Sequence, residues 1–223
     1  SLITIPTVLT NALSTALLPA ISEADALCQR TLLEKRCRQS LQYTWMWGLP
    51  VLFVLYTYGE ALGQVLFHVY GLGEMLRMLS FGAIFLYFGQ TLVGILQGLG
   101  KTGIVCRNNF FGSAAKLVGM YYCIVFLRWG GIGIAGGMVL GYGLQCLLDL
   151  GAVIRYVRIS LGWKELLSPV LGSSIMLGLI HWSWKQLGYV TEWNFLCACL
   201  IGGAGYLLVL CLLGQFSFSK NGE

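Results

Sequence analysis

Polar side chains at helical spacing interrupt otherwise apolar segments, and they are the residues of this chain best placed to do chemistry. The most informative is Lys116, which lies near the middle of the apolar segment 108–127. In such surroundings an ammonium group needs water, an acidic partner or an anionic ligand. A structural lysine, paired with a carbonyl group or a neighbouring helix, is the alternative. Lys116 therefore predicts either a wet, anion-attracting cavity or a buried structural contact.

A small set of amide and hydroxyl side chains accompanies this lysine. Within each apolar segment, its members recur four or seven residues from another polar residue or glycine, a spacing that keeps them on one face of a helix. We expect this face to line the same cavity as Lys116 and to hydrogen-bond a polar ligand. The set comprises Thr7, Asn11, Gln90, Gln97 and Asn109.

Groups that would indicate an enzyme are scarce. His68 and His181 have no acid or nucleophile motif near them in the sequence, and the eight cysteines show no zinc-finger or thioredoxin spacing. A cysteine inside an apolar run behaves as a small hydrophobic residue. We therefore predict no catalytic residue, no metal site and no cofactor.

The fifth apolar segment, 131–153, combines helix-packing glycines with a buried acid. Gly133, Gly137 and Gly141 are four residues apart, a spacing that lets two helices approach closely. Asp149 continues the same stripe near Arg155. We predict a structural ion pair between these two residues, with proton coupling by Asp149 as the alternative.

Composition indicates the solvent around these segments. Hydrophobic residues make up 57% of the 223 residues and charged residues only 10%, whereas soluble domains carry about 25% charged residues. One helical span takes about 20 residues. We predict an all-α, polytopic membrane protein with about seven transmembrane helices. They cover residues 2–21, 43–60, 78–99, 108–127, 131–153, 167–187 and 193–214.

The basic residues of the turns predict an orientation. Cytoplasmic loops of membrane proteins collect Lys and Arg. Alternate turns carry ten such residues: Arg30, Lys35, Arg36, Arg38, Lys101, Arg107, Arg155, Arg158, Lys164 and Lys220. The turns on the other side carry Arg77, Arg128 and Lys185. We therefore predict a multi-pass protein of the cytoplasmic membrane with its C-terminus in the cytoplasm, where the net charge of +5 serves topology rather than nucleic-acid binding.

The segment 22–42 is too polar to be a span. Ser22 followed by Asp25 matches a helix N-cap pattern, and Arg30, Glu34 and Arg38 would form an ion-pair ladder along one helix face. We predict a separate helix over 22–42 that lies at the membrane interface, or else a solvated connecting helix.

Two longer stretches have a distinctive sequence. Residues 6–24 read PTVLTNALSTALLPAISEA, and residues 85–101 read FLYFGQTLVGILQGLGK. Both resemble the stage V sporulation protein B-like transporters of the multidrug/oligosaccharidyl-lipid/polysaccharide flippase superfamily. The segments 116–118 and 131–136 are also similar to this family. The likeness extends through nearly all of the chain.

The resemblance implies a fourteen-span protein with two lobes around a central cavity and two extra C-terminal spans. Residues 1–153 would then form a partial C-terminal lobe of five spans, and residues 154–223 the two additional spans and a short tail. The chain opens inside an apolar segment at Ser1-Leu2-Ile3, so we expect it to continue from a longer protein. The N-terminal half of the transporter would be its partner.

Together these features predict a transporter and not an enzyme. The resemblance implies a flippase or exporter that moves a lipid-linked oligosaccharide or peptidoglycan precursor across the membrane, including in spore-envelope formation. Membrane lipid and the lipid-linked sugar would be its ligands. Three alternatives remain: a cation-coupled small-molecule exporter of the same superfamily, a membrane-embedded glycan-modifying enzyme, and a non-transporting scaffold fragment.

The predicted orientation can be tested with single cysteines in a cysteine-free background. Because basic turns face the cytoplasm, cysteines at the inside positions should resist membrane-impermeant thiol reagents in intact cells, and cysteines at the outside positions should react. The inside set is Arg36, Lys101 and Arg158, and the outside set is Glu74, Arg128 and Gly188. The reverse labelling pattern would contradict the orientation.

Overall fold

The computed structural model describes residues 7–67, 71–128, 130–157, 163–187 and 192–212. Within these ranges the chain is all-helical and contains seven helices and no strand, which confirms that the fold is all-α and that it has about seven helices; that all seven cross a membrane stays a prediction. The helices are α1 (Thr7–Ala26), α2 (Arg30–Phe67), α3 (Gly73–Gly98), α4 (Thr102–Val125), α5 (Gly131–Tyr156), α6 (Trp163–Leu187) and α7 (Glu192–Leu212).

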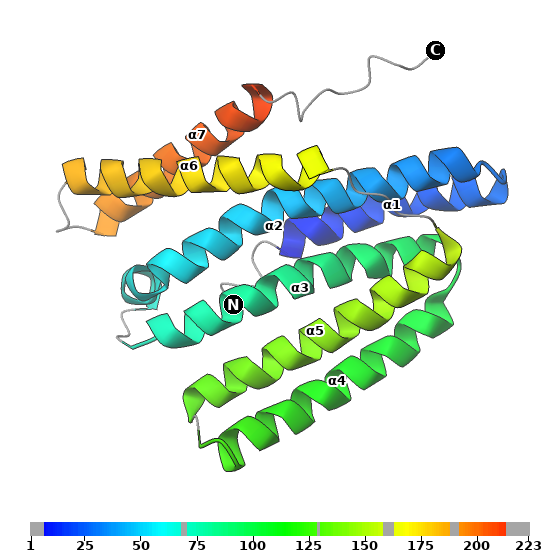
Figure 1. Cartoon of the computed structure of the whole chain (residues 1–223), viewed down its shortest axis with the longest axis horizontal. Coiled ribbons are helices and arrows are strands. Elements are labelled where there is room, and N and C mark those ends of the chain that lie inside the picture. The colour runs from blue at the N-terminus through cyan, green and yellow to red at the C-terminus, as the bar shows by residue number, and fades with distance from the viewer. Residues whose placement is uncertain (1–6, 68–70, 129, 158–162, 188–191, 213–223) are drawn as a thin grey trace. The chain divides into compact units, whose positions relative to one another are not determined.

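The helices form two compact units, Ser1–Leu161 and Gly162–Glu223. In the first unit α3 packs against α1, α2 and α5, and α4 packs mainly on α5 (Figure 1). In the second unit α6 and α7 pack on each other as a hairpin. The predicted boundary after residue 153 lies inside α5, three residues before this helix ends at Tyr156.

The turn between α3 and α4 shows how the sequence sets a helix end. Gly100 has a positive φ of 70°, a left-handed conformation that costs glycine little. The N–H of Gly100 donates to the carbonyl of Gln97, and the N–H of Lys101 donates to the carbonyl of Leu96. This pair of bonds is the Schellman arrangement that satisfies the last carbonyls of a helix. The run Gly-Leu-Gly at 98–100 therefore ends α3 and reverses the chain.

The predicted separate helix over residues 22–42 is wrong. Its first part belongs to α1, the turn Leu27–Gln29 follows with Cys28 at a positive φ of 55°, and its second part begins α2, which runs on for 38 residues. Ser22 does not cap a helix, because its hydroxyl donates to the carbonyl of Pro19 inside α1.

Packing explains why the basic segment continues into α2. Leu33, Cys37 and Leu41 are spaced by four and lie buried in one cluster with residues of α1, α3 and α5. Burial, with a smaller contribution from Glu34, raises the pKa of the Cys37 thiol to about 12. The segment therefore has a buried apolar stripe, and its charged residues occupy the remaining surface. Cys37 acts as a core residue, since a thiol that stays protonated is not reactive.

Two helices, α3 and α5, are long and apolar enough to cross a membrane; the other described helices do not meet the same criterion. In α4 the reason is its polar content, since Arg107, Asn108, Asn109 and Lys116 all lie within this helix. In α2 the helix is interrupted by a kink at Tyr58, whose φ of -111° and ψ of 19° are not helical. The structure is thus compatible with membrane insertion.

Candidate functional site

Three polar pairs join α4 to α5 along one interface. From one pair to the next, the residue number rises along α4 and falls along α5, as expected for two antiparallel helices. The pairs are Asn108 with Asp149, Asn109 with Gln145, and Lys116 with Tyr142. We call this set the α4–α5 interface.

Glycines allow α4 and α5 to approach closely enough for these pairs to form. A Cβ added at Gly141 would lie 2.6 Å from Lys116 Cβ and 2.9 Å from Lys116 Cα, and one added at Gly112 would lie 2.8 Å from Gln145 Cβ. A Cβ at Gly137 would overlap the backbone nitrogen of Met120. A larger residue at Gly137 or Gly141 would push the helices apart, because it would meet backbone atoms of α4, whereas one at Gly112 would meet the Gln145 side chain.

Lys116 is half-buried in this interface. Its Nζ lies 4.2 Å from the centroid of the Tyr142 ring, within the range of a cation–π interaction. Among the described residues no carboxylate forms an ion pair with Lys116. The ring stabilises the ammonium without neutralising it, so the positive charge remains available to an anion.

Asn109 and Gln145 form the second pair. The Gln145 side-chain amide donates to the carbonyl oxygen of the Asn109 side chain. Asn109 is exposed and Gln145 is half-buried. One predicted site residue, Asn109, is therefore held by Gln145 of α5 about two helical turns before Lys116.

Asp149 is paired differently from the prediction. Its Oδ1 accepts a hydrogen bond of 2.9 Å from Asn108 Nδ2, and the two side chains are 0% and 1% exposed. The predicted ion pair with Arg155 is wrong: six residues along an α-helix turn a side chain well away from the first, and Arg155 is exposed. Asp149 Oδ2 has no hydrogen-bond partner in the part of the chain that the structure describes.

Asn108 is a functional candidate that sequence reasoning missed. The prediction selected its neighbour Asn109. Counting back from Lys116 in steps of four reaches Gly112 and then Asn108, so the spacing signal was present. What the sequence could not supply was the partner, because Asp149 is 41 residues away.

The remaining predicted residues lie on α1 and α3. Gln90 and Thr7 are half-buried, whereas Gln97 and Asn11 are exposed. The hydroxyl of Ser14 on α1 donates to the backbone carbonyl of Gln90 at 3.2 Å, which joins these two helices. Because α1 packs on α2 and α3 while α4 packs mainly on α5, the six predicted residues divide into two groups. That both groups face one cavity stays a prediction.

Other chemistry-bearing side chains do not converge. Within the described ranges no group of three or more His, Cys, Asp or Glu could hold a metal ion. His181 is exposed on α6, and His68 lies outside the described residues. The α4–α5 interface is therefore the candidate site that the geometry favours.

Comparison with known proteins found no matching family model. Two curated proteins of Bacillus subtilis (strain 168) are similar to this chain. Stage V sporulation protein B is 27% identical over 165 residues, which cover 74% of this chain and 32% of the relative. Sporulation protein YkvU is 26% identical over 155 residues, which cover 70% of this chain and 35% of the relative.

The chain thus spans about a third of the length of these relatives. The similarity confirms the predicted resemblance to stage V sporulation protein B-like proteins. Neither relative is named as an enzyme, which agrees with the prediction that this chain is not one.

The buried Asn108–Asp149 pair makes a testable contribution to stability. Asn108→Leu should lower the free energy of unfolding by about 1–3 kcal/mol, because it leaves the buried Asp149 carboxyl group without a partner. Asn109→Leu is the matched control on the exposed side of the same turn and should cost less. Thermal and denaturant unfolding in detergent micelles would measure both. The double variant Asn108→Leu/Asp149→Leu should lose less free energy of unfolding than Asn108→Leu alone, because no buried polar group is left without a partner. An equal or larger loss would argue against the pairing.

Proposed function

We propose that this chain is part of a flippase that moves a lipid-linked oligosaccharide or peptidoglycan precursor across the cytoplasmic membrane. The observation that carries the proposal is the positive charge of Lys116, held between two helices with no carboxylate partner among the described residues.

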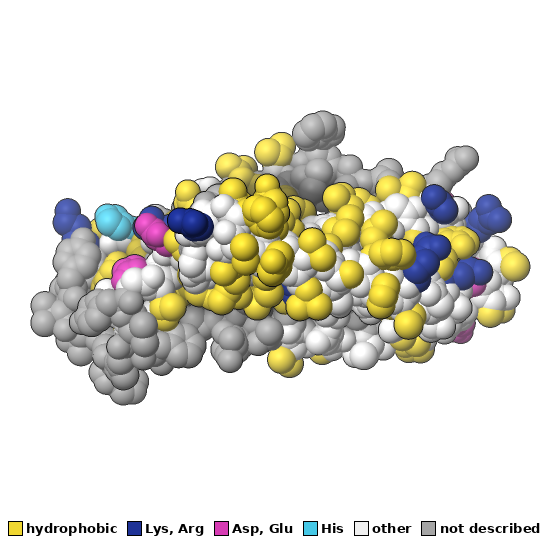
Figure 2. Space-filling view, turned by 90° about the horizontal axis from the view of Figure 1, so that it is seen from below, with side chains coloured by type: hydrophobic (Ala, Val, Ile, Leu, Met, Phe, Trp, Pro, Cys, Tyr) yellow, Lys and Arg dark blue, Asp and Glu magenta, His cyan; other side chains and the backbone are white. Residues whose placement is uncertain are grey.

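The outer face of α4 supports a lipid environment. Its most exposed large apolar side chains are Phe110 at 72%, Leu117 at 69%, and Val118 and Phe126 at 68%. Burying one such side chain away from water contributes about 1.5–3 kcal/mol of stabilising free energy, which is lost if the side chain stays in water. Soluble monomers rarely expose a large contiguous apolar patch. Figure 2 shows hydrophobic side chains spread along the middle of the molecule's face in this view. Lipid is the solvent that such a helix favours.

The charges of the first unit support an orientation across the membrane. Exposed basic residues lie near the start of α2, between α3 and α4, near the start of α4 and at the end of α5: Arg30, Lys35, Arg36, Lys101, Arg107 and Arg155. Figure 2 shows Lys and Arg side chains gathered at the right-hand end of the view. By the preference of basic turns for the cytoplasm, this end of the first unit faces the cytoplasm, and the C-terminus of the chain follows on the same side.

Lys116 then lies at membrane depth, fourteen residues into α4 from Thr102. A rise of 1.5 Å per residue places it about 20 Å from the start of that helix. A cation at this depth marks a substrate or ion pathway in many membrane proteins. An anionic polyprenyl-diphosphate sugar is a suitable ligand for this cation. Its diphosphate would pair with the ammonium group, and the side-chain amides of Asn109, Gln90 and Gln97 would hydrogen-bond phosphate or sugar oxygens.

Reorientation of such a substrate requires two lobes that move about a site near the bilayer midplane. This chain supplies one side of that site, and its partner is the N-terminal half of the transporter. Both similar proteins are named for sporulation. We therefore propose that this chain also has a role in building the spore envelope.

A second candidate function is cation-coupled export of a small molecule. The observation that favours it is Asp149, a fully buried acid with one oxygen that has no hydrogen-bond partner. An intramembrane carboxyl group of this kind is typical of proton and ion relays. The two functions differ in their ligand: the first requires a lipid-linked diphosphate, and the second does not.

Substitutions at Lys116 test the proposed function in the intact protein reconstituted in liposomes. Lys116→Met should slow flipping of a fluorescent lipid-linked sugar by about tenfold to a hundredfold, because a hydrogen bond to a charged group contributes about 1.5–3 kcal/mol. Lys116→Arg should retain more activity than Lys116→Met, since charge matters more than shape for a diffuse phosphate contact. Lys35→Met, which removes an exposed cation of α2, is the matched control and should flip normally.

Two outcomes of this assay would count against the site. Full activity of Lys116→Met would remove the lysine from the substrate pathway. Loss of folded protein in Lys116→Met, detected by size-exclusion chromatography and thermal unfolding, would favour a structural lysine.

A further inference from the structure

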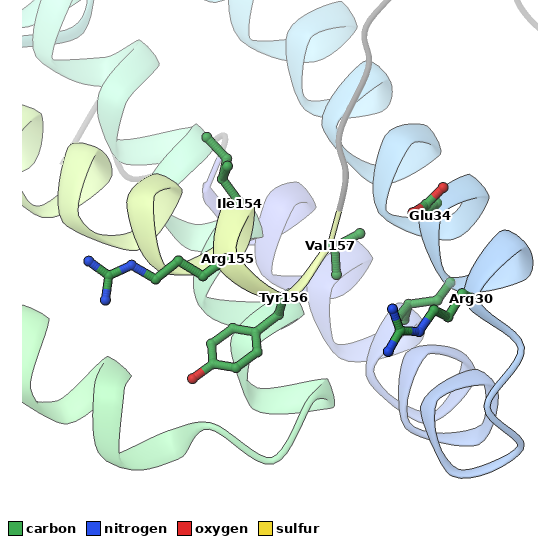
Figure 3. Close-up of a pocket in the computed structure, with 7 residues that line it drawn as sticks. Arg30, Glu34, Ile154, Arg155, Tyr156 and Val157 are labelled. Atoms are coloured by element: carbon green, nitrogen blue, oxygen red, sulfur yellow. The ribbon is translucent and has the colours of Figure 1, made fainter.

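A second concave basic site lies where α4 begins and α5 ends. A cavity of about 180 Å³ is lined from α4 by Ile104, Arg107 and Asn108 and from α5 by residues that include Arg155 and Tyr156. A neighbouring cavity of about 220 Å³ shares Arg155 and Tyr156 and adds Arg30 and Glu34 of α2. Figure 3 shows Tyr156 between Arg30 and Arg155, with Arg155 pointing away from Arg30.

The charges around the smaller cavity are unbalanced. Arg107 and Arg155 line it, and no carboxylate of the described residues does. The nearby acid Asp149 is fully buried and accepts its hydrogen bond from Asn108. Lys101 adds a further cation, since its Nζ lies 5.1 Å from the centroid of the Tyr156 ring. Glu34 lines only the larger cavity, so the smaller one is the stronger anion site.

The start of α4 adds to this positive potential. The residue before the helix, Lys101, makes no capping hydrogen bond through its side chain. The first N–H groups of a helix carry its positive dipole end and are suited to binding anions. In α4 these first N–H groups lie in the same helical turn as Ile104, which lines the cavity.

We propose that the cavity lined by Arg107, Arg155 and Tyr156 binds a phosphate group at the cytoplasmic face. Guanidinium groups bind phosphate oxygens in a bidentate manner, and these two come from different helices. At about 30 Å³ per water molecule, the cavity has room for one phosphate group with part of its hydration shell. The phosphate can belong to a lipid headgroup or be free in solution.

The site is more than the general excess of basic residues at this end. Lys35 and Arg36 are also exposed there but line neither cavity. They provide a comparison in which the charge is the same but the side chain lines neither of the two cavities. The inference concerns binding only and does not depend on transport, nor on Lys116.

The test measures phosphate binding by the purified full chain in detergent and in lipid vesicles. One arm titrates inorganic pyrophosphate into the detergent-solubilised protein. The other compares phosphatidylcholine vesicles that contain either phosphatidic acid, with its terminal phosphate, or phosphatidylserine. Arg155→Gln and Arg107→Gln should each weaken binding about tenfold or more, the loss expected for a charged hydrogen-bond pair. Arg36→Gln, with the same change in net charge, should alter binding less than about twofold, because Arg36 lines neither cavity and a single exposed charge outside a site contributes little.

Binding of both pyrophosphate and phosphatidic acid would support a site for the phosphate group alone. Binding of phosphatidic acid without pyrophosphate would support a headgroup site that also needs the lipid chains. Absence of binding to both probes, equal binding of phosphatidylserine, or an equal loss in Arg36→Gln would overturn the proposal. Thermal unfolding without ligand identifies any variant that fails to fold, and because the two arginines lie on different helices, either variant alone provides the test.

Discussion

The close approach of α4 to α5 is the contact on which the rest of the candidate site depends. It is possible because Gly112, Gly137 and Gly141 present no side chain where the two backbones meet. With the helices this close, Lys116 reaches the Tyr142 ring, and Asn108 reaches the buried Asp149. The same contact brings the start of α4 beside the end of α5, where Arg107 and Arg155 line one cavity.

The face of α4 that points away from α5 has a different composition and a different favoured environment. Its exposed aromatic and aliphatic side chains, such as Phe110 and Leu117, are stable in lipid and unfavourable in water. Polar groups placed on that face would have to be satisfied without water, at a high free-energy cost. The helix therefore concentrates its lysine and asparagines toward α5 and its large apolar residues away from it. We expect Lys116 to attract a diphosphate because its cation is held between helices in apolar surroundings.

Sequence patterns predicted the local features well and the relations between helices poorly. The number of helices follows from apolar periodicity, and the predicted end of the third span at residue 99 lies within one residue of the end of α3 at Gly98, because both features depend on only a few neighbouring residues. The separate helix over 22–42 was wrong because Leu33 and Cys37 are buried by tertiary packing, which polarity along the chain does not reveal. Asn108 was missed, and Asp149 was assigned to Arg155, for a related reason. A side chain's partner depends on the register between two helices, and that register is set by contacts 41 residues apart in the sequence.

The central claim is that Lys116 faces a water-filled pathway while the adjoining face of α4 lies in lipid. The most direct measurement is the reactivity of single cysteines at positions 116 and 117 with a small water-soluble thiol reagent, in the intact protein in lipid bilayers. Leu117 is the informative neighbour because it is 69% exposed and apolar. The account predicts that Lys116→Cys reacts and Leu117→Cys does not. Reaction at both positions would mean that this face of α4 is in water, and reaction at neither would mean that no aqueous pathway reaches Lys116.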